Sequence, residues 1–259
     1  MCPPKYYGVY YEINPWMSVA NPADIDVARR QWNNLHDLYR SLGVEVELLE
    51  PVEGLPDMVF TANAGLIDGN RCVVSNFRHQ QRKGEEPYFK KWFQEHGFEI
   101  LELPPEYHFE GAGDTKCYQD VLFAGFHFRS DARSHTVISH FLQRRVIPLE
   151  LVDEKFYHLD TCFAPLARSL VMYYPPAFAR YSRRAIQHYV TDLLPVDKED
   201  ALGFACNCVV VDDKVIVNWA SPALRAELAT RGFEVLEVDV SEFMKAGGGT
   251  GCLTLVLEP

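Results

Sequence analysis

The chain has 259 residues, of which 47% are hydrophobic, enough to form the core of one large domain or two smaller ones. It carries 25 Lys and Arg against 36 Asp and Glu, a formal net charge of −11. This acidic balance argues against a nucleic-acid partner, which requires clustered basic side chains, and suits a cationic ligand. No stretch has the ~20 apolar residues of a transmembrane helix, so we expect no membrane partner.

The cysteine pattern and the N-terminal residues indicate the cellular compartment. Seven cysteines are an odd number in a chain of this size, which argues against a disulfide scaffold and for a reducing environment. The first residues lack the apolar core of a signal peptide. We therefore expect a cytoplasmic protein. The pair Cys206 and Cys208 has no second pair at ligand spacing, so a zinc site there is not expected and neither cysteine is given a role. The sequence gives no indication of oligomeric state.

A helix followed by a strand recurs along the chain at intervals of roughly 45 to 55 residues, which indicates a repeat architecture. Apolar spacing predicts helices over 31–42, 88–96, 134–144, 183–189 and 222–231. The strands that follow them are predicted over 43–50, 97–103, 145–151, 189–195 and 232–238. Gly43, Gly97 and Gly232 stand where a helix C-terminal glycine belongs.

A pair of apolar segments accompanies these units and predicts hairpins. Residues 58–67 and 71–77 flank Asp-Gly-Asn, a strong turn signal, and 206–211 and 214–218 flank Asp-Asp. The last hairpin is predicted to be closed by residues 7–13. The whole pattern is a ββαβ repeat present five times, which predicts an α/β fold of five blades closed around a central pocket. The alternative, a doubly wound parallel sheet, fits the strand pairs poorly. No flexible linker interrupts the repeats, so residues 1–259 are expected to form a single domain.

A cysteine near the end of the chain follows a run of glycines, in the sequence Gly-Gly-Gly-Thr-Gly-Cys at 247–252. Glycines allow positive φ and leave space for a ligand beside the sulfur of Cys252. Only a thiolate is nucleophilic, so such a site needs neighbours that favour ionisation. The alternative is an inert cysteine buried in a C-terminal strand.

Other unusual polar residues fall at the start of each predicted hairpin's first strand. They are Asn63, Glu110 with Asp114, His158 with Asp160, Cys206 with Asn207, and finally Cys252. Equivalent positions of a closed propeller converge on its axis, so these groups are predicted to line one pocket. Separately, each has an ordinary explanation as a turn residue, a surface loop or a local hydrogen bond. A metal site is a weaker alternative because the set lacks recognisable ligand spacing, and we expect neither metal nor cofactor.

Four sequence motifs, in this order, resemble the guanidine-modifying superfamily of penteins, which includes arginine deiminases, dimethylarginine dimethylaminohydrolases, amidinotransferases and arginine dihydrolases. They read Phe-Thr-Ala-Asn-Ala-Gly at 60–65, Phe-Glu-Gly-Ala-Gly-Asp at 109–114, His-Leu-Asp-Thr at 158–161, and the glycine run that ends at Cys252. The similarity extends over nearly the whole chain. Its opening, including Tyr-Glu-Ile-Asn-Pro-Trp-Met at 11–17, is most similar to the arginine dihydrolases.

The resemblance implies a role for each of these residues. Cys252 would attack the guanidinium carbon as a thiolate and form a covalent amidino intermediate. His158 would protonate departing ammonia and then deprotonate water, and Glu110 would hydrogen-bond His158 and favour its charged form. Asp160 would hold guanidinium nitrogens through charge-assisted hydrogen bonds. Ala112 departs from the family's usual loop beside Glu110.

The resemblance also implies contacts to the rest of a small-molecule substrate. Arg82 and Arg129 are the candidates for its α-carboxylate, because arginine pairs bidentately with carboxylates. Arg78 competes with Arg82, and any of the three could instead be a solvated surface residue. Asn14 would contact substrate near the mouth of the pocket, and Ala246 would supply a backbone carbonyl.

Asn63 decides between members of the superfamily. Deiminases usually carry aspartate here, whereas asparagine offers an NH₂ donor that can bind a ureido oxygen. By resemblance, asparagine marks the dihydrolases, which convert arginine to ornithine, carbon dioxide and two ammonia, and this is the leading hypothesis. The alternatives are a dimethylarginine dimethylaminohydrolase, an arginine deiminase that stops at citrulline, and, from another class, a non-catalytic pentein that binds a ligand. The chain length makes an amidinotransferase a weaker candidate.

Overall fold

The computed structural model describes residues 1–257 and, within them, contains four three-stranded sheets. In each sheet the central strand pairs antiparallel with the strand before it and parallel with the strand after it. The sheets are β1 (Gly65–Asp68), β2 (Arg71–Val74) and β3 (Glu99–Leu101); β4 (Thr115–Tyr118), β5 (Val121–Phe126) and β6 (Arg145–Glu150); β7 (Phe163–Pro165), β8 (Leu170–Tyr173) and β9 (Asp192–Pro195); and β10 (Val209–Val211), β11 (Lys214–Val217) and β12 (Glu234–Glu237).

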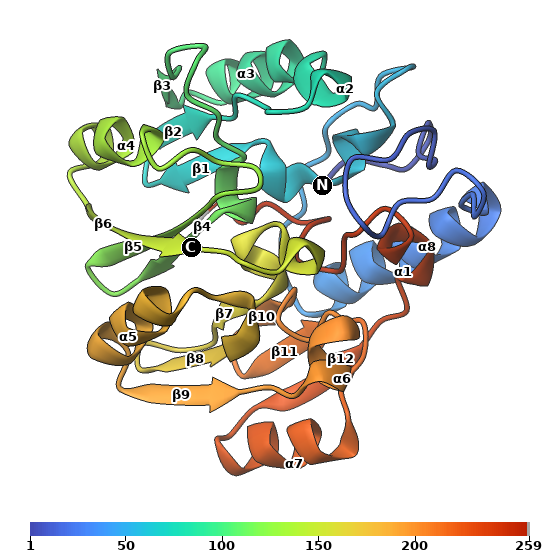
Figure 1. Cartoon of the computed structure of the whole chain (residues 1–259). Helices are drawn as coiled ribbons and strands as arrows, with labels where there is room; N and C mark the ends of the chain where they lie inside the picture. The colour runs from blue at the N-terminus through green and yellow to red at the C-terminus, as the bar shows by residue number, and fades with distance from the viewer. Residues whose placement is uncertain (258–259) are drawn as a thin grey trace.

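Helices join the second strand of each sheet to the third, and Figure 1 shows them on the periphery of the molecule. These helices are α3 (Glu86–Glu95), α4 (Ser134–Leu142), α5 (Arg180–Tyr189) and α7 (Pro222–Thr230). The other helices of the described residues are α1 (Ile25–Ser41), α2 (Gln80–Lys83), α6 (Lys198–Leu202) and α8 (Ser241–Met244). The ββαβ repeat predicted from the sequence is therefore formed four times.

The fifth unit is where the structure departs from the prediction. Residues 7–13 are not a strand, so the prediction that they close the last hairpin is wrong. Tyr7 instead packs its ring on Phe243, with centroids 4.8 Å apart, and donates its hydroxyl to the carbonyl of Glu242. Residues 43–50 are also not assigned to a strand, although α1 precedes them as expected. Asp24 caps α1 by accepting from two backbone N–H groups, so the helix begins earlier than its apolar pattern suggested.

The polar motifs lie in short 3₁₀ turns just ahead of the first strand of a sheet rather than in the strand itself. The turns are Thr61–Asn63, Gly111–Gly113 and Leu159–Thr161, before β1, β4 and β7. Gly111 has φ +61°, and a Cβ there would stand 2.8 Å from the backbone of Gly65. Glycine thus allows two turns from neighbouring units to pack closely. This close packing brings their side chains to one place.

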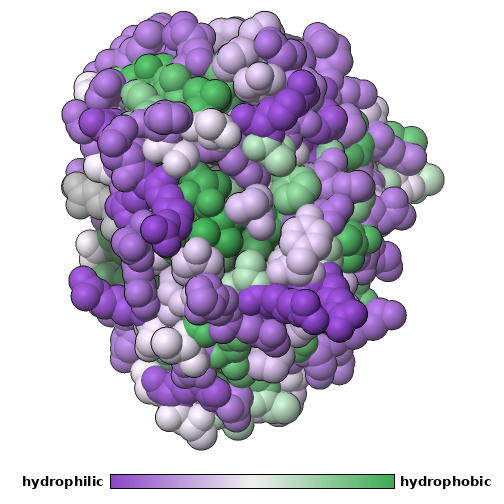
Figure 2. Space-filling model, turned by 60° about the vertical axis from the view of Figure 1, so that its left-hand side comes forward, coloured by the Kyte–Doolittle hydropathy of each residue, from purple (hydrophilic) through white to green (hydrophobic). Residues whose placement is uncertain are grey.

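The outer surface is mostly hydrophilic on the face shown in Figure 2, with smaller hydrophobic areas between the polar side chains. The most extensive core cluster runs through the sheets β4–β6, β7–β9 and β10–β12 and includes fully buried aromatic side chains such as Phe123 and Phe163. Among the described residues, no helix combines the length and the apolarity needed to span a membrane.

Candidate active site

A small buried cavity gathers residues from widely separated parts of the chain. Six of the nine predicted site residues line it, together with five others. The lining residues are Ile13, Asn14, Asp57, Phe60, Asn63, Arg82, Arg129, Tyr157, Ala246, Gly248 and Cys252. The cavity has about 10 Å³ of free volume, room for roughly one water. The structure is therefore closed, and a larger ligand enters only when a bordering segment moves.

Asn207 holds the thiol of Cys252 in place. Its Nδ2 donates to Cys252 Sγ at 3.2 Å, and its Oδ1 accepts from the backbone N–H groups of Cys252 at 2.9 Å and Gly249 at 3.0 Å. Sγ also lies 3.5 Å from Asp160 Oδ2. Burial, reinforced by Asp160, raises the pKa of the Cys252 thiol well above its usual value. The resting thiol is thus protonated, and a bound cation would favour its ionisation.

The residues before Cys252 must be glycines because side-chain atoms of other residues lie very close to their backbone. A Cβ at Gly248 would lie 2.4 Å from the ring of Phe60, and one at Gly249 would lie 2.8 Å from Asn207 Oδ1. Gly247 has φ +85°, in the left-handed region that favours glycine. The run therefore lets the chain fold tightly around Asn207 and the cavity, rather than forming a flexible tail.

His158, Glu110 and Arg129 form a buried chain of charges beside the cavity. His158 Nε2 lies 2.7 Å from Glu110 Oε2, and Arg129 donates to the same oxygen at 2.8 Å. Burial alone would raise the pKa of Glu110, but the Arg129 guanidinium and His158 hold it well below its usual range. Glu110 is therefore a carboxylate that supports a positive charge on His158. His158 Nδ1 is buried without a hydrogen-bond partner, as a group awaiting a ligand would be.

Asp114 helps to position the segments that carry His158 and Glu110. It accepts from the backbone N–H of Leu159 at 3.1 Å and from the Ser130 hydroxyl at 2.6 Å. Ser130 in turn accepts from the backbone N–H of Glu110 at 3.0 Å. One buried carboxyl group thereby links the segments that carry His158 and Glu110. Burial raises the pKa of Asp114 to about 6.

Arg82 sets the orientation of Asn63. Arg82 donates to both carboxylate oxygens of Glu85, at 2.9 and 2.7 Å, and to Asn63 Oδ1 at 2.8 Å. An arginine can only donate, so this bond directs the amide nitrogen of Asn63 the other way. That nitrogen is buried and has no partner. A Cβ at Gly113 would lie 2.2 Å from Asn63 Nδ2 and 3.5 Å from His158 Nδ1, so both atoms converge on Gly113.

The structure distinguishes Arg78 from Arg82 by their positions relative to the cavity. It also shows where Asn14 and Ala246 lie. Arg78 is absent from the cavity lining and pairs with Asp131 at 2.9 Å, so the geometry favours Arg82 over it. Arg129 lies over the Tyr157 ring, 4.6 Å from its centroid. Asn14 Nδ2 donates to the carbonyl of Ala246 at 3.0 Å, and both residues line the cavity.

Two residues of the site were not assigned a role from the sequence. Asp57 is 2% exposed, its Oδ2 accepts from the Tyr11 hydroxyl, and its Oδ1 has no partner. Nothing in its local sequence marks it, since no equivalent recurs in the other units. Asn207 does occupy the recurring turn position, and this was the available signal, but its contact with Cys252 requires the fold.

The described residues were also compared with the requirements of a metal site and of a second reactive cysteine. No group of three or more His, Cys, Asp or Glu side chains in 1–257 is arranged to hold a metal ion. All seven cysteines are free thiols. Burial raises the pKa of the Cys206 and Cys208 thiols, as it does for Cys252, but neither residue lines the cavity.

We expect Asn207→Asp to lower kcat/KM by roughly tenfold to hundredfold. A carboxylate in place of the amide donor would add negative charge beside Cys252 and raise the thiol pKa further. Because kcat/KM reports the free enzyme, its rise with pH should move to higher pH. The measurement is a pH profile of kcat/KM with arginine, the substrate that the resemblance of the sequence motifs implies.

The matched control is Asn218→Asp, since Asn218 makes only two hydrogen bonds, to Val240 and Gly203, away from the cavity. An unshifted profile in Asn207→Asp, with normal thermal stability, would show that Asn207 does not tune the thiol.

Comparisons with known proteins identify the family of the chain. The model of the family described as "N,N dimethylarginine dimethylhydrolase, eukaryotic" matches residues 17–257. The bifunctional arginine dihydrolase/ornithine cyclodeaminase ArgZ of Synechocystis is 48% identical, over all of this chain but only 37% of its own length. The N(G),N(G)-dimethylarginine dimethylaminohydrolase of Mycobacterium tuberculosis is 40% identical, over all of this chain and 85% of its own length.

Solved structures of related proteins have a similar fold. The N-terminal domain of ArgZ, a cyanobacterial arginine dihydrolase crystallised as a substrate-bound mutant, superposes with a TM-score of 0.96 at 47% identity. That match covers 99% of this chain and 96% of the domain. A dimethylarginine dimethylaminohydrolase superposes at 0.78 with 23% identity, which supports the mixed α/β fold alone. The chain belongs to the dimethylarginine dimethylhydrolase-type family of guanidine-modifying penteins.

Proposed function

We propose that this protein hydrolyses the guanidinium group of L-arginine through Cys252 and acts as an arginine dihydrolase. One observation supports this most directly: four buried polar atoms without partners belong to residues around one cavity. They are Asp57 Oδ1, Asp160 Oδ1, Asn63 Nδ2 and His158 Nδ1. Two carboxylates suit a planar cation, because their charge-assisted bonds would satisfy its N–H donors. The near-identical fold of ArgZ supports the same substrate class.

The first half-reaction follows from this geometry. Asp160 and Asp57 would hold the guanidinium, whose positive charge lowers the cost of ionising Cys252. The thiolate adds to the guanidinium carbon, and His158, hydrogen-bonded to Glu110, gives its proton to the leaving ammonia. The C–N bond breaks and an amidino-thioether remains on Cys252. His158 then removes a proton from water, water adds to the carbon, and the thiolate leaves to release citrulline.

The second half-reaction requires the site to hold citrulline. Its ureido oxygen accepts hydrogen bonds, and Asn63 Nδ2 offers an unused donor. Cys252 would then attack the ureido carbon and a second ammonia would leave. Hydrolysis of the remaining carbamoyl-thioether and loss of carbon dioxide give ornithine. This second round distinguishes a dihydrolase from a deiminase.

The rest of the substrate would be held at the cavity mouth. We propose that Arg82 and Arg129 face the α-carboxylate, since both line the cavity. Their charges are partly balanced by Glu85 and Glu110, so they would act through remaining N–H donors. Asn14 and the carbonyl of Ala246 would contact the substrate's amino-acid end. Trp16 ties this segment to the carbonyl of Lys155 at 2.8 Å, so entry requires that bond to open.

A second candidate is dimethylarginine dimethylaminohydrolase, which the name of the matching family and the Mycobacterium tuberculosis relative favour. Purified protein should be incubated separately with arginine, citrulline and dimethylarginine, and ornithine, citrulline, ammonia and dimethylamine quantified. We expect about two ammonia for each ornithine from arginine and little dimethylamine. Citrulline without ornithine would indicate a deiminase, and dimethylamine as the main product would support the second candidate. Tight arginine binding without turnover would indicate a non-catalytic pentein.

The expectations for the overall architecture, the domain organisation and the cellular compartment are also proposals. We propose a five-bladed α/β propeller in which the chain ends form the fifth blade, because four ββαβ units surround the site and Cys252 comes from a fifth. We propose one domain over 1–259, whose last two residues lie outside the described part. A reducing cytoplasm is favoured by the seven free thiols. The chain spans about two fifths of the length of the bifunctional relatives.

A further inference from the structure

One residue beside the active site has a backbone conformation that its side chain does not favour. Within 1–257, five residues other than glycine have positive φ. Four of them lie between 52° and 63°, in the small left-handed α region that short polar side chains tolerate. The fifth, His127, has φ 114°, beyond that region, where glycine is the usual residue. Such strain persists only where the surrounding structure holds it, and it clusters at functional sites.

The imidazole of His127 gives no reason for this strain. Its side chain is 55% exposed, and Nδ1 lies 3.7 Å from Glu150 Oε1, too far for a hydrogen bond. An exposed pair of this kind contributes little to stability. The ring packs edge-on against Phe128, with centroids 4.9 Å apart. The reason for the strain therefore lies in the backbone and in the residues that follow.

The chain is fixed on both sides of His127. Phe126, the last residue of β5, is held in the parallel ladder with β6. Asp131 donates its backbone N–H to the carbonyl of His108 at 2.9 Å. The four residues between these two points must therefore form a tight turn. His127 closes it by donating its backbone N–H to the carbonyl of Ser130 at 3.3 Å.

The turn carries two side chains from the surface into the site. Arg129, two residues after the exposed His127, is 3% exposed and donates to Glu110 Oε2 at 2.8 Å. Ser130 accepts from the backbone N–H of Glu110 at 3.0 Å and donates to Asp114 Oδ2 at 2.6 Å. The turn thus supplies one partner to the carboxylate of Glu110 and another to its backbone.

The other complete units do not make this bend. Ser75, Tyr174 and Asn218 come directly after β2, β8 and β11, as His127 comes after β5. None of the three has positive φ, and Tyr174 is extended, with φ −103°. The ββαβ repeat therefore does not require the bend. It occurs in the unit whose next residues reach Glu110.

We propose that His127 is a positioning residue whose positive-φ backbone, rather than its imidazole, aims Arg129 and Ser130 at Glu110. With an ordinary negative φ at 127, the chain would leave β5 in another direction and both contacts to Glu110 would be lost. The part of this proposal that concerns turnover rests on the proposed function, in which Glu110 supports His158 and Arg129 faces the substrate carboxylate. The part that concerns the bend and its contacts does not.

Three substitutions separate the backbone of residue 127 from its side chain. His127→Gly removes the strain, so we expect the melting temperature to rise by roughly 2 to 6 °C, with arginine kcat/KM within about twofold of the unmodified protein. His127→Ala keeps the strain and removes only the imidazole, so both quantities should stay close to those of the unmodified protein. His127→Val adds a β-branched side chain that positive φ does not tolerate, and should lower the melting temperature by roughly 4 to 8 °C.

The valine variant should also release Glu110. Amide hydrogen exchange at Glu110 should accelerate by at least about tenfold, because its N–H loses the Ser130 hydroxyl. Arginine kcat/KM should fall by at least about tenfold, and its loss at acid pH should begin at higher pH. Burial raises the pKa of Glu110, whereas Arg129, His158 and Arg82 lower it. Without Arg129 the carboxylate is therefore protonated at higher pH.

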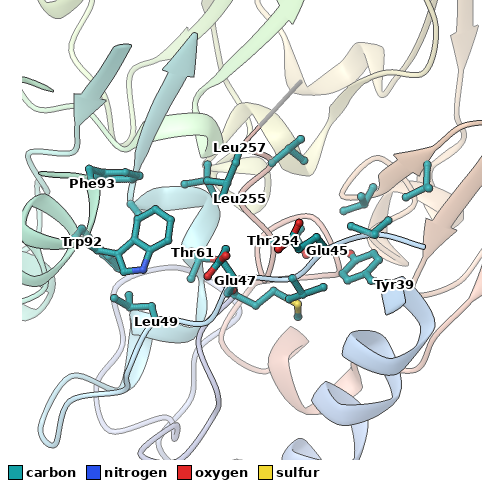
Figure 3. Close-up of a pocket in the computed structure, with 18 of the residues that line it drawn as sticks. Tyr39, Glu45, Glu47, Leu49, Thr61, Trp92, Phe93, Thr254, Leu255 and Leu257 are labelled. Atoms are coloured by element: carbon teal, nitrogen blue, oxygen red, sulfur yellow. Dashed lines mark hydrogen bonds between the residues drawn. The ribbon is translucent and has the colours of Figure 1, made fainter. Parts of the chain in front are cut away.

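Asp212 provides matched controls at a positive φ away from the cavity. It has φ 53° in the turn after β10, a strand that lines the large groove of Figure 3 and not the cavity around Cys252. Asp212→Gly should leave the melting temperature nearly unchanged, because aspartate tolerates this φ. Asp212→Val should lower it about as much as His127→Val does, without faster exchange at Glu110 or a shifted pH profile.

The proposal is overturned if His127→Gly melts no higher than the unmodified protein, or if His127→Val exchanges at Glu110 no faster than Asp212→Val. A loss in His127→Ala as large as in His127→Val would also overturn it, because the imidazole would then be the positioning group. Melting and exchange need no turnover, so a failure of the proposed function would leave both results standing. His127→Gly tests the proposal even where the valine variant does not fold.

Discussion

Replacing Cys252 with serine should lower arginine turnover by at least about 10³-fold while leaving arginine binding within a fewfold of the unmodified protein. The serine hydroxyl is nearly isosteric, and it can still accept from Asn207 Nδ2, which now lies 3.2 Å from the sulfur. Its pKa is far too high for ionisation beside Asp160, so no nucleophile forms. Ammonia release and calorimetric titration with arginine measure the two effects separately.

Cys117→Ser is the matched control, because Cys117 is a partly buried thiol on β4 outside the cavity lining. It should retain nearly full activity. Turnover of Cys252→Ser within tenfold of the unmodified protein would reject the nucleophile assignment. Loss of both turnover and binding, with a lowered melting temperature, would instead assign the change to folding.

Asn63→Asp should convert the enzyme toward a deiminase. We expect ornithine formation to fall by about 10²-fold or more, with citrulline accumulating, while arginine consumption falls much less. Arg82 can donate to aspartate as it does to Asn63 Oδ1, at 2.8 Å in the present structure. The second oxygen, however, replaces the amide donor of Asn63, which has no partner in the present structure. It would repel the ureido oxygen of citrulline and attract the guanidinium of arginine. Time courses of both products from arginine, and of ornithine from added citrulline, measure the change.

Asn218→Asp again serves as the control for a new charge outside the cavity and should leave the product ratio unchanged. If ornithine remains the main product of Asn63→Asp, the amide donor does not decide the second hydrolysis. If the variant loses arginine consumption as well, the added charge beside the Arg82–Glu85 pair has disrupted the site rather than its selectivity.

The repeat and the order of the polar motifs were readable from the sequence because both depend on local spacing. Helix periodicity and glycine positions predicted the helices of all four complete units, with ends displaced by a few residues. The recurring turn position predicted that Asn63, Glu110, His158 and Cys252 would meet, because equivalent positions of a repeat converge. The strand predicted over residues 7–13 is wrong, because their apolar pattern reflects packing of Tyr7 on α8 rather than strand pairing.

The tertiary structure decided how the side chains are oriented and which residues support them. Asn207 and Cys252 are 45 residues apart, and the bonds that hold the thiol exist only when two units meet. Arg82 fixes which end of the Asn63 amide is left without a partner, and Asp57 lines the cavity without any local signal. Local patterns therefore determined the elements and the chemistry-bearing residues, while contacts between distant units determined the orientation of those residues.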